Sequence, residues 1–456
     1  MTASLLGIFI LLLLLFAGAP LGFAMMAVGF VGYGLIRGWE PALVMVPQQI
    51  LDLALNFGFS VLPLFILMGV FVARSGMSED LYDACYKWLG HFRGGLALAT
   101  CAGFASVSGS SLATAATMAK VAVPAMRKFR YSDSFAVGTV AAGGTLGMLI
   151  PPSTAMIIYG ILTEVDVAKL FVGGVLPGLL TVIVYFGVIS VVVRVSPNAG
   201  PPGDRTGWRE RWIALSKVWG VIALFVMIMG GIFMGIFTPS EAGGIGAFGA
   251  LAFAIGRKKM SWWHFFASLV EAGRITALIF VVAFGALILN QFVNIAGLPA
   301  AMAAFIENLD VSLTQTLLLI LLIYILLGTI IEGLAIIFLT VPIFVPIVEN
   351  LGFDLIWFGV VMIMIIEISL ITPPIGLNVF VMKSMLPEVP LIDIFKGIGP
   401  FFVGDIIRLL IVAFFPPIVL YLPSLPSIDL VGQGVRLQPG GDLGACFGVR
   451  CGDHQG

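Results

Sequence analysis

Charged residues are scarce in this chain: Asp, Glu, Lys and Arg make up 10% of its 456 residues, whereas hydrophobic residues make up 60%. Soluble domains carry about a quarter charged residues, so the composition excludes a soluble globular protein. Many apolar runs reach the roughly 20 residues that a helix needs to cross a bilayer. The sequence therefore predicts an all-α polytopic protein embedded in the lipid bilayer.

Several signatures of other functions are missing. The chain has no Gly-x4-Gly-Lys-Ser/Thr pattern, which P-loop nucleotide hydrolysis requires. A net charge of −1 gives no basic surface for nucleic acid. The three histidines and four cysteines lie too far apart to form a transition-metal cluster, and only Cys446 and Cys451 are neighbours. We therefore expect no enzyme, no nucleic-acid partner and no organic cofactor.

The most informative pattern that is present is a duplication. Leu149-Ile150-Pro151-Pro152-Ser153 interrupts an apolar stretch in the first half, and Ile371-Thr372-Pro373-Pro374-Ile375 interrupts another in the second. Val123-Pro124 and Val345-Pro346 are separated by the same interval as these two Pro-Pro pairs. Paired hydrophobic segments broken by Gly or Pro in corresponding positions of two halves indicate a secondary transporter and its binding site.

The apolar and polar stretches divide the chain into five parts, with a re-entrant hairpin and a broken helix in each repeat. The predicted parts are N-terminal scaffold helices at 1–52, a first repeat at 53–195 with hairpin 96–126 and broken helix 131–163, a cytoplasmic loop and linking helices at 196–260, a second repeat at 261–426 with hairpin 313–348 and broken helix 353–386, and a polar tail at 427–456. The tail is Gly-rich and has the composition of a disordered segment. Two helices separated near Pro20 are expected within residues 4–36, and further spans of the second repeat are expected at 274–294 and 399–422.

Residues 96–126 allow two interpretations. A continuous tilted helix would bury the polar run Ser106-Val107-Ser108-Gly109-Ser110-Ser111 in lipid. A re-entrant hairpin places this run at a tip near mid-membrane, where irregular backbone is tolerated if protein or a watery cavity surrounds it. We favour the hairpin.

The distribution of basic residues predicts the orientation in the membrane. Counting spans places Arg127 to Arg130, the 194–217 loop and Arg257-Lys258-Lys259 on one side, and short cytoplasmic loops collect Lys and Arg. The first hairpin then enters from the cytoplasm and the second from the opposite side. The two repeats are therefore expected to be inverted in the membrane, with both termini on the side opposite the cytoplasm.

The hairpin tips and helix breaks are the expected cation sites, because unwound backbone carbonyls supply oxygen ligands without a buried fixed charge. Proline adds to this supply, since it leaves the carbonyl four residues earlier without its usual partner. The alternative is that small residues only allow close helix packing and prolines only kink helices. The candidate cation-binding residues are Ser106, Ser108, Gly109, Ser110, Ser111, Gly143, Thr145, Gly147, Pro151 and Pro152 in the first half, and Gly328, Thr329, Glu332, Gly333, Thr372, Pro373, Pro374 and Gly376 in the second.

Five ionisable residues need separate interpretations. Glu332, at the second hairpin tip, is either a functional intramembrane carboxylate or the cap of the following half-helix. Glu241 is expected in the first turn of a helix after Thr238-Pro239-Ser240. Asp405 and Arg408, three residues apart on one helical face, are expected to pair. Glu367 falls within the range of the second broken helix, and its environment stays open.

The chain also resembles a known family at these residues: the large membrane subunit of tripartite ATP-independent periplasmic (TRAP) transporters, within the ion-transporter superfamily. The resemblance extends to about residue 426. The segments that carry it are Gly103-Phe104-Ala105-Ser106-Val107-Ser108-Gly109-Ser110-Ser111, Gly147-Met148-Leu149-Ile150-Pro151-Pro152-Ser153, Phe237-Thr238-Pro239-Ser240-Glu241-Ala242 and Ile371-Thr372-Pro373-Pro374-Ile375-Gly376.

The resemblance implies import of an organic acid, such as a C4-dicarboxylate or another carboxylate, across the bacterial inner membrane by Na⁺ symport. It also implies two partners, a periplasmic solute-binding protein and a small four-helix membrane subunit. The fold that it implies is an elevator-type scaffold plus transport domain, in which both hairpins and both broken helices move together and both termini are periplasmic. Substrate is expected between the two hairpin tips, where Ser110, Ser153 and Asn378 are the candidate contacts. Na⁺ is the expected coupling ion, and the resemblance implies that the candidate cation-binding residues at the hairpin tips and helix breaks bind sodium.

Two other functions compete with this one. A stand-alone Na⁺- or H⁺-coupled carboxylate transporter of the same superfamily would work without a binding protein. A membrane subunit of a redox-driven or proton pump would use chains of intramembrane Asp, Glu, Lys or His, whereas this sequence shows isolated ones.

Overall fold

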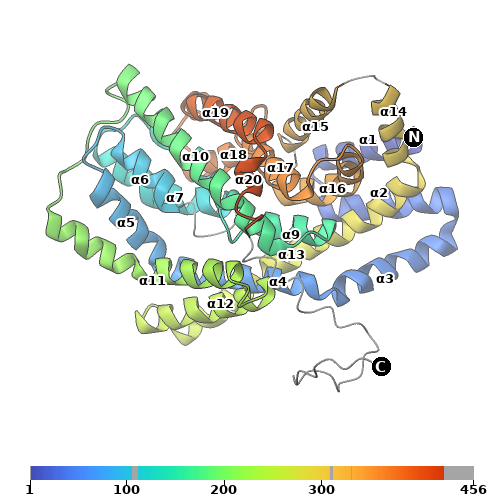
Figure 1. Ribbon diagram of the computed structural model, residues 1–456, viewed down its shortest axis with the longest axis horizontal. Helices are drawn as coiled ribbons and strands as arrows, with labels where there is room; N and C mark the ends of the chain where they lie inside the picture. Colours follow the sequence, from blue (N-terminus) through green and yellow to red (C-terminus); the bar gives the residue numbers. More distant parts are fainter. Residues whose placement is uncertain (1, 105–110, 309–311, 330, 426–456) are drawn as a thin grey trace, which may run out of the picture.

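The computed structural model describes residues 2–104, 111–308, 312–329 and 331–425. All regular elements in these ranges are helices, which confirms the all-α prediction (Figure 1). Seven of the described helices are long and apolar enough to cross a membrane. Cys446 and Cys451 belong to the predicted tail and lie outside the described residues.

The N-terminal part contains the two helices expected around Pro20, α1 (Thr2–Phe16) and α2 (Leu21–Arg37), followed by α3 (Trp39–Leu55). Glycines set the position of α2. Gly22 and Gly29 lie directly against the backbone of α13 (Trp262–Ile295), where a larger side chain would overlap Val281 and Leu289. Small residues at such a crossing let two membrane helices approach closely.

The first half continues through a 3₁₀ turn and seven helices. They are the turn Phe57–Ser60, α4 (Val61–Arg74), α5 (Met77–Leu89), α6 (Gly95–Phe104), α7 (Ser111–Lys128), α8 (Asp133–Leu149), α9 (Thr154–Thr163) and α10 (Val167–Val195). Helices α6 and α7 stand where the sequence predicts the first hairpin, and its predicted tip at 105–110 lies outside the described residues. Helices α8 and α9 form the first broken helix.

Two linking helices, α11 (Trp208–Phe233) and α12 (Pro239–Gly256), precede α13. The second half then contains α14 (Leu298–Asn308), α15 (Leu313–Gly328), α16 (Gly333–Asn350), α17 (Leu355–Ser369), α18 (Leu377–Met385), α19 (Leu391–Phe414) and α20 (Pro417–Leu420). Helices α15 and α16 occupy the range of the second predicted hairpin, and α17 and α18 form the second broken helix. The five-part division and the inversion of the repeats stay predictions.

Two helices differ in their ends from the predicted spans. The span expected at 274–294 is the C-terminal part of α13, which begins at Trp262 after the N-cap Ser261. The charged residues Glu271 and Arg274 do not end this helix, because both lie on its exposed side and Glu271 pairs with Arg74 of α4. The last span, expected at 399–422, begins already at Leu391 and ends at Phe414.

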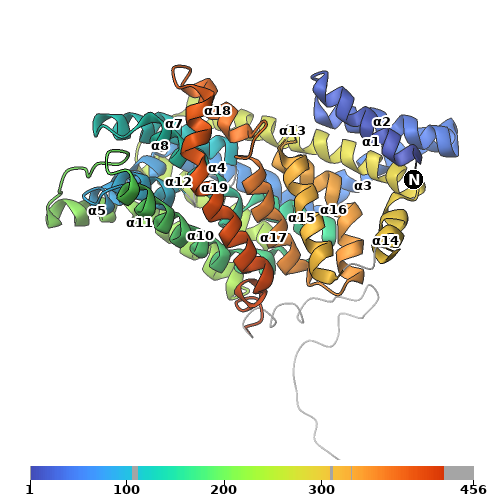
Figure 2. The ribbon, with the colours of Figure 1, turned by 90° about the horizontal axis from the view of Figure 1, so that it is seen from above.

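The helices that precede the two breaks are the most enclosed ones in the described structure. Every residue of α8 from Phe135 to Leu149 is buried, and so is every residue of α17 from Trp357 to Ser369. A helix that is buried on all sides needs protein neighbours around its whole circumference. Figure 2 shows α17 and α8 among other helices, with α10 and α19 crossing beside them.

The two halves meet where α8 crosses α19. Gly138 of α8 faces Gly397 of α19, and a methyl group on Gly397 would overlap the carbonyl oxygen of Ser134. The Ser134 hydroxyl donates to the Asp393 carbonyl at 2.6 Å, which adds a polar contact to the same crossing. Backbone here touches backbone, so the crossing has no room for a side chain at either glycine.

This crossing provides a stability test with an internal control. We expect Gly397→Ala to destabilise the protein by about 1–3 kcal/mol, because the added methyl forces α8 and α19 apart. Gly399→Ala, on the same helix with nothing within 4 Å of the added methyl, should be neutral or slightly stabilising. Thermal unfolding of the purified protein in detergent measures both. Equal effects of the two substitutions would contradict the proposed close contact.

Candidate transport site

The first helix break is closed by a serine. Pro151 and Pro152 have no N–H, so the carbonyls of Gly147 and Met148 lose their usual helical partners. The Ser153 hydroxyl donates to the Met148 carbonyl and also accepts a hydrogen bond from the Met156 N–H at 3.3 Å, which caps α9. Ser153 is fully buried. Of the two freed carbonyls, Met148 is therefore satisfied by the break itself.

The second break uses the backbone instead. Pro373 and Pro374 free the carbonyls of Ser369 and Leu370. The Thr372 N–H donates to the Ser369 carbonyl at 3.1 Å, and the Asn378 N–H donates to the Leu370 carbonyl at 3.1 Å. The chain can turn back in this way because Gly376, which precedes α18, has a φ of 63° that favours glycine. The Pro-Pro peptide bond is cis in both breaks.

Asn378 joins the two halves at this point. Its Nδ2 donates to the Ser111 Oγ at 2.8 Å and to the Ala141 carbonyl at 3.2 Å. Ser111 begins α7, directly after the first predicted hairpin tip, and Ala141 belongs to α8. The Asn378 side chain is fully buried, and its Oδ1 has no hydrogen-bond partner in the described structure.

A small cavity of about 20 Å³ lies beside these residues. Its lining comes from both halves: Ser111, Leu112, Met148 and Thr154 from the first, and Glu332, Leu334 and Leu370 from the second. A cavity of this size has room for one water molecule or a small ion. It does not hold a carboxylate substrate in this conformation.

Glu332 caps the helix that follows the second hairpin tip. Its Oε2 accepts a hydrogen bond from the Ala335 N–H at 3.3 Å, at the N-terminus of α16. The capping interpretation is therefore confirmed, and the same carboxylate also lines the cavity. Glu241 forms a capping box with Thr238 at the start of α12, as expected for a first-turn acid.

The end of α15 is fitted closely to the second break. A methyl group on Gly328 would overlap the Oγ of Ser369, the last residue of α17. The Ser369 hydroxyl is fixed in place, since it donates to the Ile366 carbonyl at 2.6 Å. The hairpin and the broken helix of the second half are thus in direct contact.

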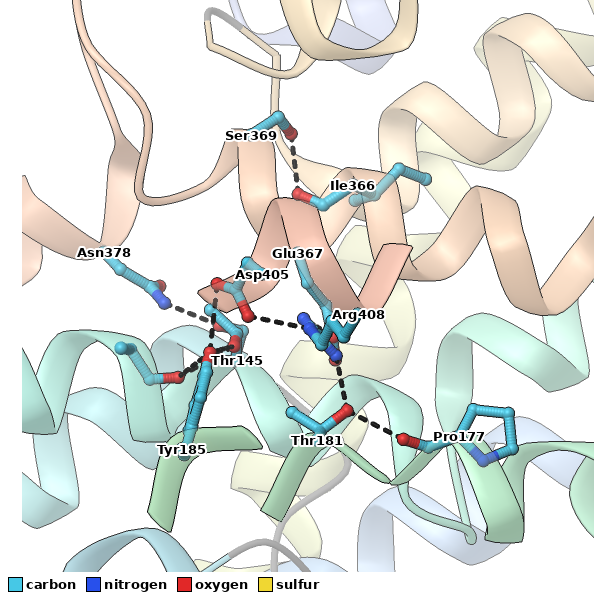
Figure 3. A network of polar contacts seen from close by, with 12 residues as sticks. Thr145, Pro177, Thr181, Tyr185, Ile366, Glu367, Ser369, Asn378, Asp405 and Arg408 are labelled. Carbon is cyan, nitrogen blue, oxygen red and sulfur yellow. Dashed lines mark hydrogen bonds and ion pairs between the residues drawn. The ribbon is translucent and has the colours of Figure 1, made fainter. Parts of the chain in front are cut away.

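A fully buried ionic network lies next to the breaks (Figure 3). The Arg408 Nε donates to Asp405 Oδ1 at 2.7 Å, which confirms the predicted pair, and Arg408 Nη2 donates to Glu367 Oε2 at 2.9 Å. Arg408 Nη1 donates to Thr181 at 2.7 Å, and the Tyr185 hydroxyl donates to Asp405 Oδ2 at 3.1 Å. The network connects α10 of the first half with α17 and α19 of the second.

The duplication predicts one more relation within this network. Thr145 and Glu367 are separated by the same interval as the two Pro-Pro pairs, so they occupy equivalent positions in α8 and α17. Thr145 lies 3.5 Å from the Tyr185 hydroxyl, and Glu367 binds Arg408. Each broken helix therefore contacts the network from the corresponding position, one with a neutral group and one with a carboxylate.

The structure brings only part of the predicted site together. Ser111, Ser153, Asn378, Glu332 and the two Pro-Pro breaks lie around the cavity or in the turns beside it. Thr329 and Thr372 use their hydroxyls to bond carbonyls of their own helices, at 2.8 and 2.6 Å. Ser106, Ser108, Gly109 and Ser110 lie outside the described residues. The remaining predicted positions, Gly143 and Gly333, are buried in or at the start of helices.

Sequence reasoning missed Thr181, Tyr185 and Ser369. Thr181 and Tyr185 lie one helical turn apart on α10. Two polar residues at that spacing in an apolar span lie on one face of the helix, and this pattern could have indicated a polar contact there. The sequence does not indicate a role for Ser369, because this role depends on how closely Gly328 of α15 approaches its side chain.

The Gly328–Ser369 contact can be tested by a paired substitution. We expect Gly328→Ala to lower transport activity by about tenfold, because the overlap displaces the hairpin from the break, at a cost of about 1–3 kcal/mol. Combining it with Ser369→Gly should restore much of the activity, since the obstructing hydroxyl is gone. Gly187→Ala in α10, with nothing within 4 Å, is the control. Uptake assays on the wild type and these three variants measure the transport activity. Failure of the double substitution to recover activity would contradict this contact.

The sequence of this chain matches a family model over residues 8–418, described as Tripartite ATP-independent periplasmic transporter, DctM component. It is 34% identical over 402 residues to the C4-dicarboxylate TRAP transporter large permease protein DctM of Pseudomonas aeruginosa, covering 85% of this chain and 93% of that protein. It is 32% identical over 416 residues to the sialic acid TRAP transporter large permease protein SiaM of Vibrio cholerae, covering 90% and 96%.

The fold is similar to a solved structure as well. The Alcanivorax borkumensis YdaH transporter superposes with a TM-score of 0.61 over 91% of this chain and 99% of that one, at 13% identity. Identity this low supports the fold only. The family match and the similar permeases agree over almost the whole length. The chain therefore belongs to the DctM family of tripartite ATP-independent periplasmic transporters, as a large permease subunit and multi-pass membrane protein.

Proposed function

We propose that this permease imports an organic acid by Na⁺ symport, together with a periplasmic solute-binding protein and a small four-helix membrane subunit. The observation that carries the proposal is the cavity that both halves line between the second hairpin and the two helix breaks. A site shared by two repeats at their breaks is typical of secondary transporters.

The oxygen atoms around Asn378 support a sodium site. The Asn378 Oδ1 is buried without a hydrogen-bond partner in the described structure, and Ser111 Oγ lies 2.8 Å from its Nδ2. A buried polar oxygen that stays unsatisfied costs about 1–3 kcal/mol. A cation such as Na⁺ removes that cost, and neutral oxygen ligands hold it without a fixed counter-charge. The Gly147 carbonyl, whose helical partner Pro151 removes, is a further ligand candidate.

The substrate class is proposed from the similar permeases and the polar groups at the breaks. The names of two of them specify C4-dicarboxylate and sialic acid, which are both organic acids. Ser153 and Asn378 supply neutral hydrogen-bonding groups from the two halves. We place the substrate between the hairpin tips in a more open conformation than this one, because the present cavity is too small.

The transport movement that we propose is of the elevator type. The breaks of both halves are tied together by Asn378, by the α8–α19 crossing and by the Arg408 network. Such a body can move as a unit against scaffold helices that include α1–α3 in the inner membrane. The basic loops are proposed to face the cytoplasm and both termini the periplasm.

Replacing Asn378 tests the sodium site. We expect Asn378→Ala to raise the Na⁺ concentration needed for half-maximal uptake by about tenfold, the size of a lost buried ligand interaction of about 1.4 kcal/mol. Asn350→Ala, at the exposed end of α16, is the matched control. The measurement is uptake into proteoliposomes across a range of Na⁺ concentrations. Unchanged sodium activation in Asn378→Ala would refute the assignment.

Dependence on a binding protein needs a separate experiment. The permease, reconstituted with its small subunit, should take up substrate only when the cognate solute-binding protein is added, because that protein delivers the substrate. Uptake is compared between the complete system and systems that lack the binding protein or the small subunit. Equal uptake without the soluble protein would instead support a stand-alone transporter.

A further inference from the structure

The Arg408 network contains more negative than positive charge. Arg408, Asp405 and Glu367 are each 0% exposed, so one guanidinium faces two carboxyl groups away from solvent. If both carboxyl groups were ionised, the cluster would carry one uncompensated negative charge. Burying such a charge is strongly unfavourable, and a folded protein avoids it by binding a neutralising partner.

Among the described residues, Arg408 is the one cation that pairs with Glu367 and Asp405. The other basic residues of these helices, Lys169 and Arg194 of α10 and Lys396 of α19, lie near the helix ends. Around Glu367, α19 contributes Asp405 and Arg408, and α10 contributes Tyr185 and Thr181. Helix α8 contributes the Leu149 backbone beside Glu367, and Thr145, which contacts Tyr185. Tyr159 of α9 and Tyr324 of α15 face the far end of α17, at Leu355 and Phe358. The remaining ionisable groups near this assembly are Cys101 of α6, which faces Asp405, Glu332 at the start of α16 and the exposed Glu349 at its end.

The hydrogen bonds distinguish the two carboxyl groups. Both oxygens of Asp405 accept hydrogen bonds, from Arg408 and from Tyr185, as expected for an ionised carboxylate. Only one oxygen of Glu367 does so. Its Oε2 accepts from Arg408, whereas its Oε1 is buried with no hydrogen-bond donor in the described structure.

We propose that Glu367 is a proton-binding site inside the transport unit, with the proton taken from water and held on Oε1. The O–H bond removes the excess charge, while Oε2 still accepts the hydrogen bond from Arg408. Asp405 stays ionised as the counter-ion of Arg408. The equivalent position in the first half is Thr145, a neutral residue, so the protonated glutamic acid makes the two broken helices alike in charge.

Infrared spectroscopy of the full-length protein tests this directly. A protonated carboxylic acid has a C=O stretching band separate from that of a carboxylate. We expect such a band at neutral pH that shifts when glutamate side-chain carboxyl groups are labelled with carbon-13, and that disappears in Glu367→Gln but not in Glu349→Gln. A band that shifts with labelled aspartate instead, or one that remains unchanged in Glu367→Gln, would overturn the proposal.

A second measurement uses stability. A group that is protonated in the folded protein and ionised in the unfolded chain makes the unfolding free energy fall as pH rises, until the folded protein also releases the proton. The melting temperature of the wild type should therefore fall more steeply from about pH 6 to about pH 9 than that of Glu367→Gln. Parallel curves would count against the proposal, and Glu349→Gln should follow the wild type.

The functional consequence is a loss of uptake at alkaline pH. In proteoliposomes with equal pH on both sides and saturating Na⁺, wild-type uptake should fall at alkaline pH, and Glu367→Gln should keep uptake within about twofold of its neutral value because the amide cannot ionise. A decline of the same size in both proteins would overturn this role. The infrared and melting measurements need no transport, so their outcome is independent of the Na⁺ symport proposed above.

Discussion

The absence of water in the hydrocarbon core is the constraint on which this structure depends. Every interrupted turn of a membrane helix must find partners for its backbone within the protein. The chain interrupts helices at two places where α8 and α17 are enclosed by neighbours on all sides. It compensates the breaks with local substitutes: the Ser153 hydroxyl in the first half and the Thr372 and Asn378 N–H groups in the second. Irregular backbone is possible here because the surrounding helices exclude lipid.

The two halves use different chemistry at corresponding positions. A serine closes one break, whereas a glycine with positive φ starts the helix after the other. Thr145 and Glu367 face a common network from equivalent places, yet only one of them carries a carboxyl group. The two halves therefore share the Pro-Pro breaks but differ in the side chains around them. Asn378, which reaches from the second half to Ser111 of the first, has no equivalent amide, because the corresponding position of the first repeat is Met156.

Much of this arrangement could be predicted from the sequence because it depends on local chemistry. Three features of the sequence determine structure within a few residues of themselves. They are the Pro-Pro pairs, the polar runs in apolar segments and the Asp405–Arg408 spacing. The Pro-Pro breaks and the ion pair were found at their expected places in the described structure. The network around Glu367 could not be predicted, because its members come from α10, α17 and α19 and depend on how three helices pack. The Gly328–Ser369 contact was missed for the same reason. Helix ends were the least predictable part: α13 continues through Glu271 and Arg274, since charged side chains on an exposed face do not stop a helix.

Glu332 combines two roles that oppose each other. Its carboxylate lines the cavity and at the same time holds the first turn of α16 through the Ala335 N–H. Any ligand that draws this carboxylate away uncovers the helix start, and loss of such a cap costs about 1 kcal/mol. Occupancy of the cavity and fraying of α16 are thus coupled, so that a ligand which leaves the cap in place is favoured over one that competes for it.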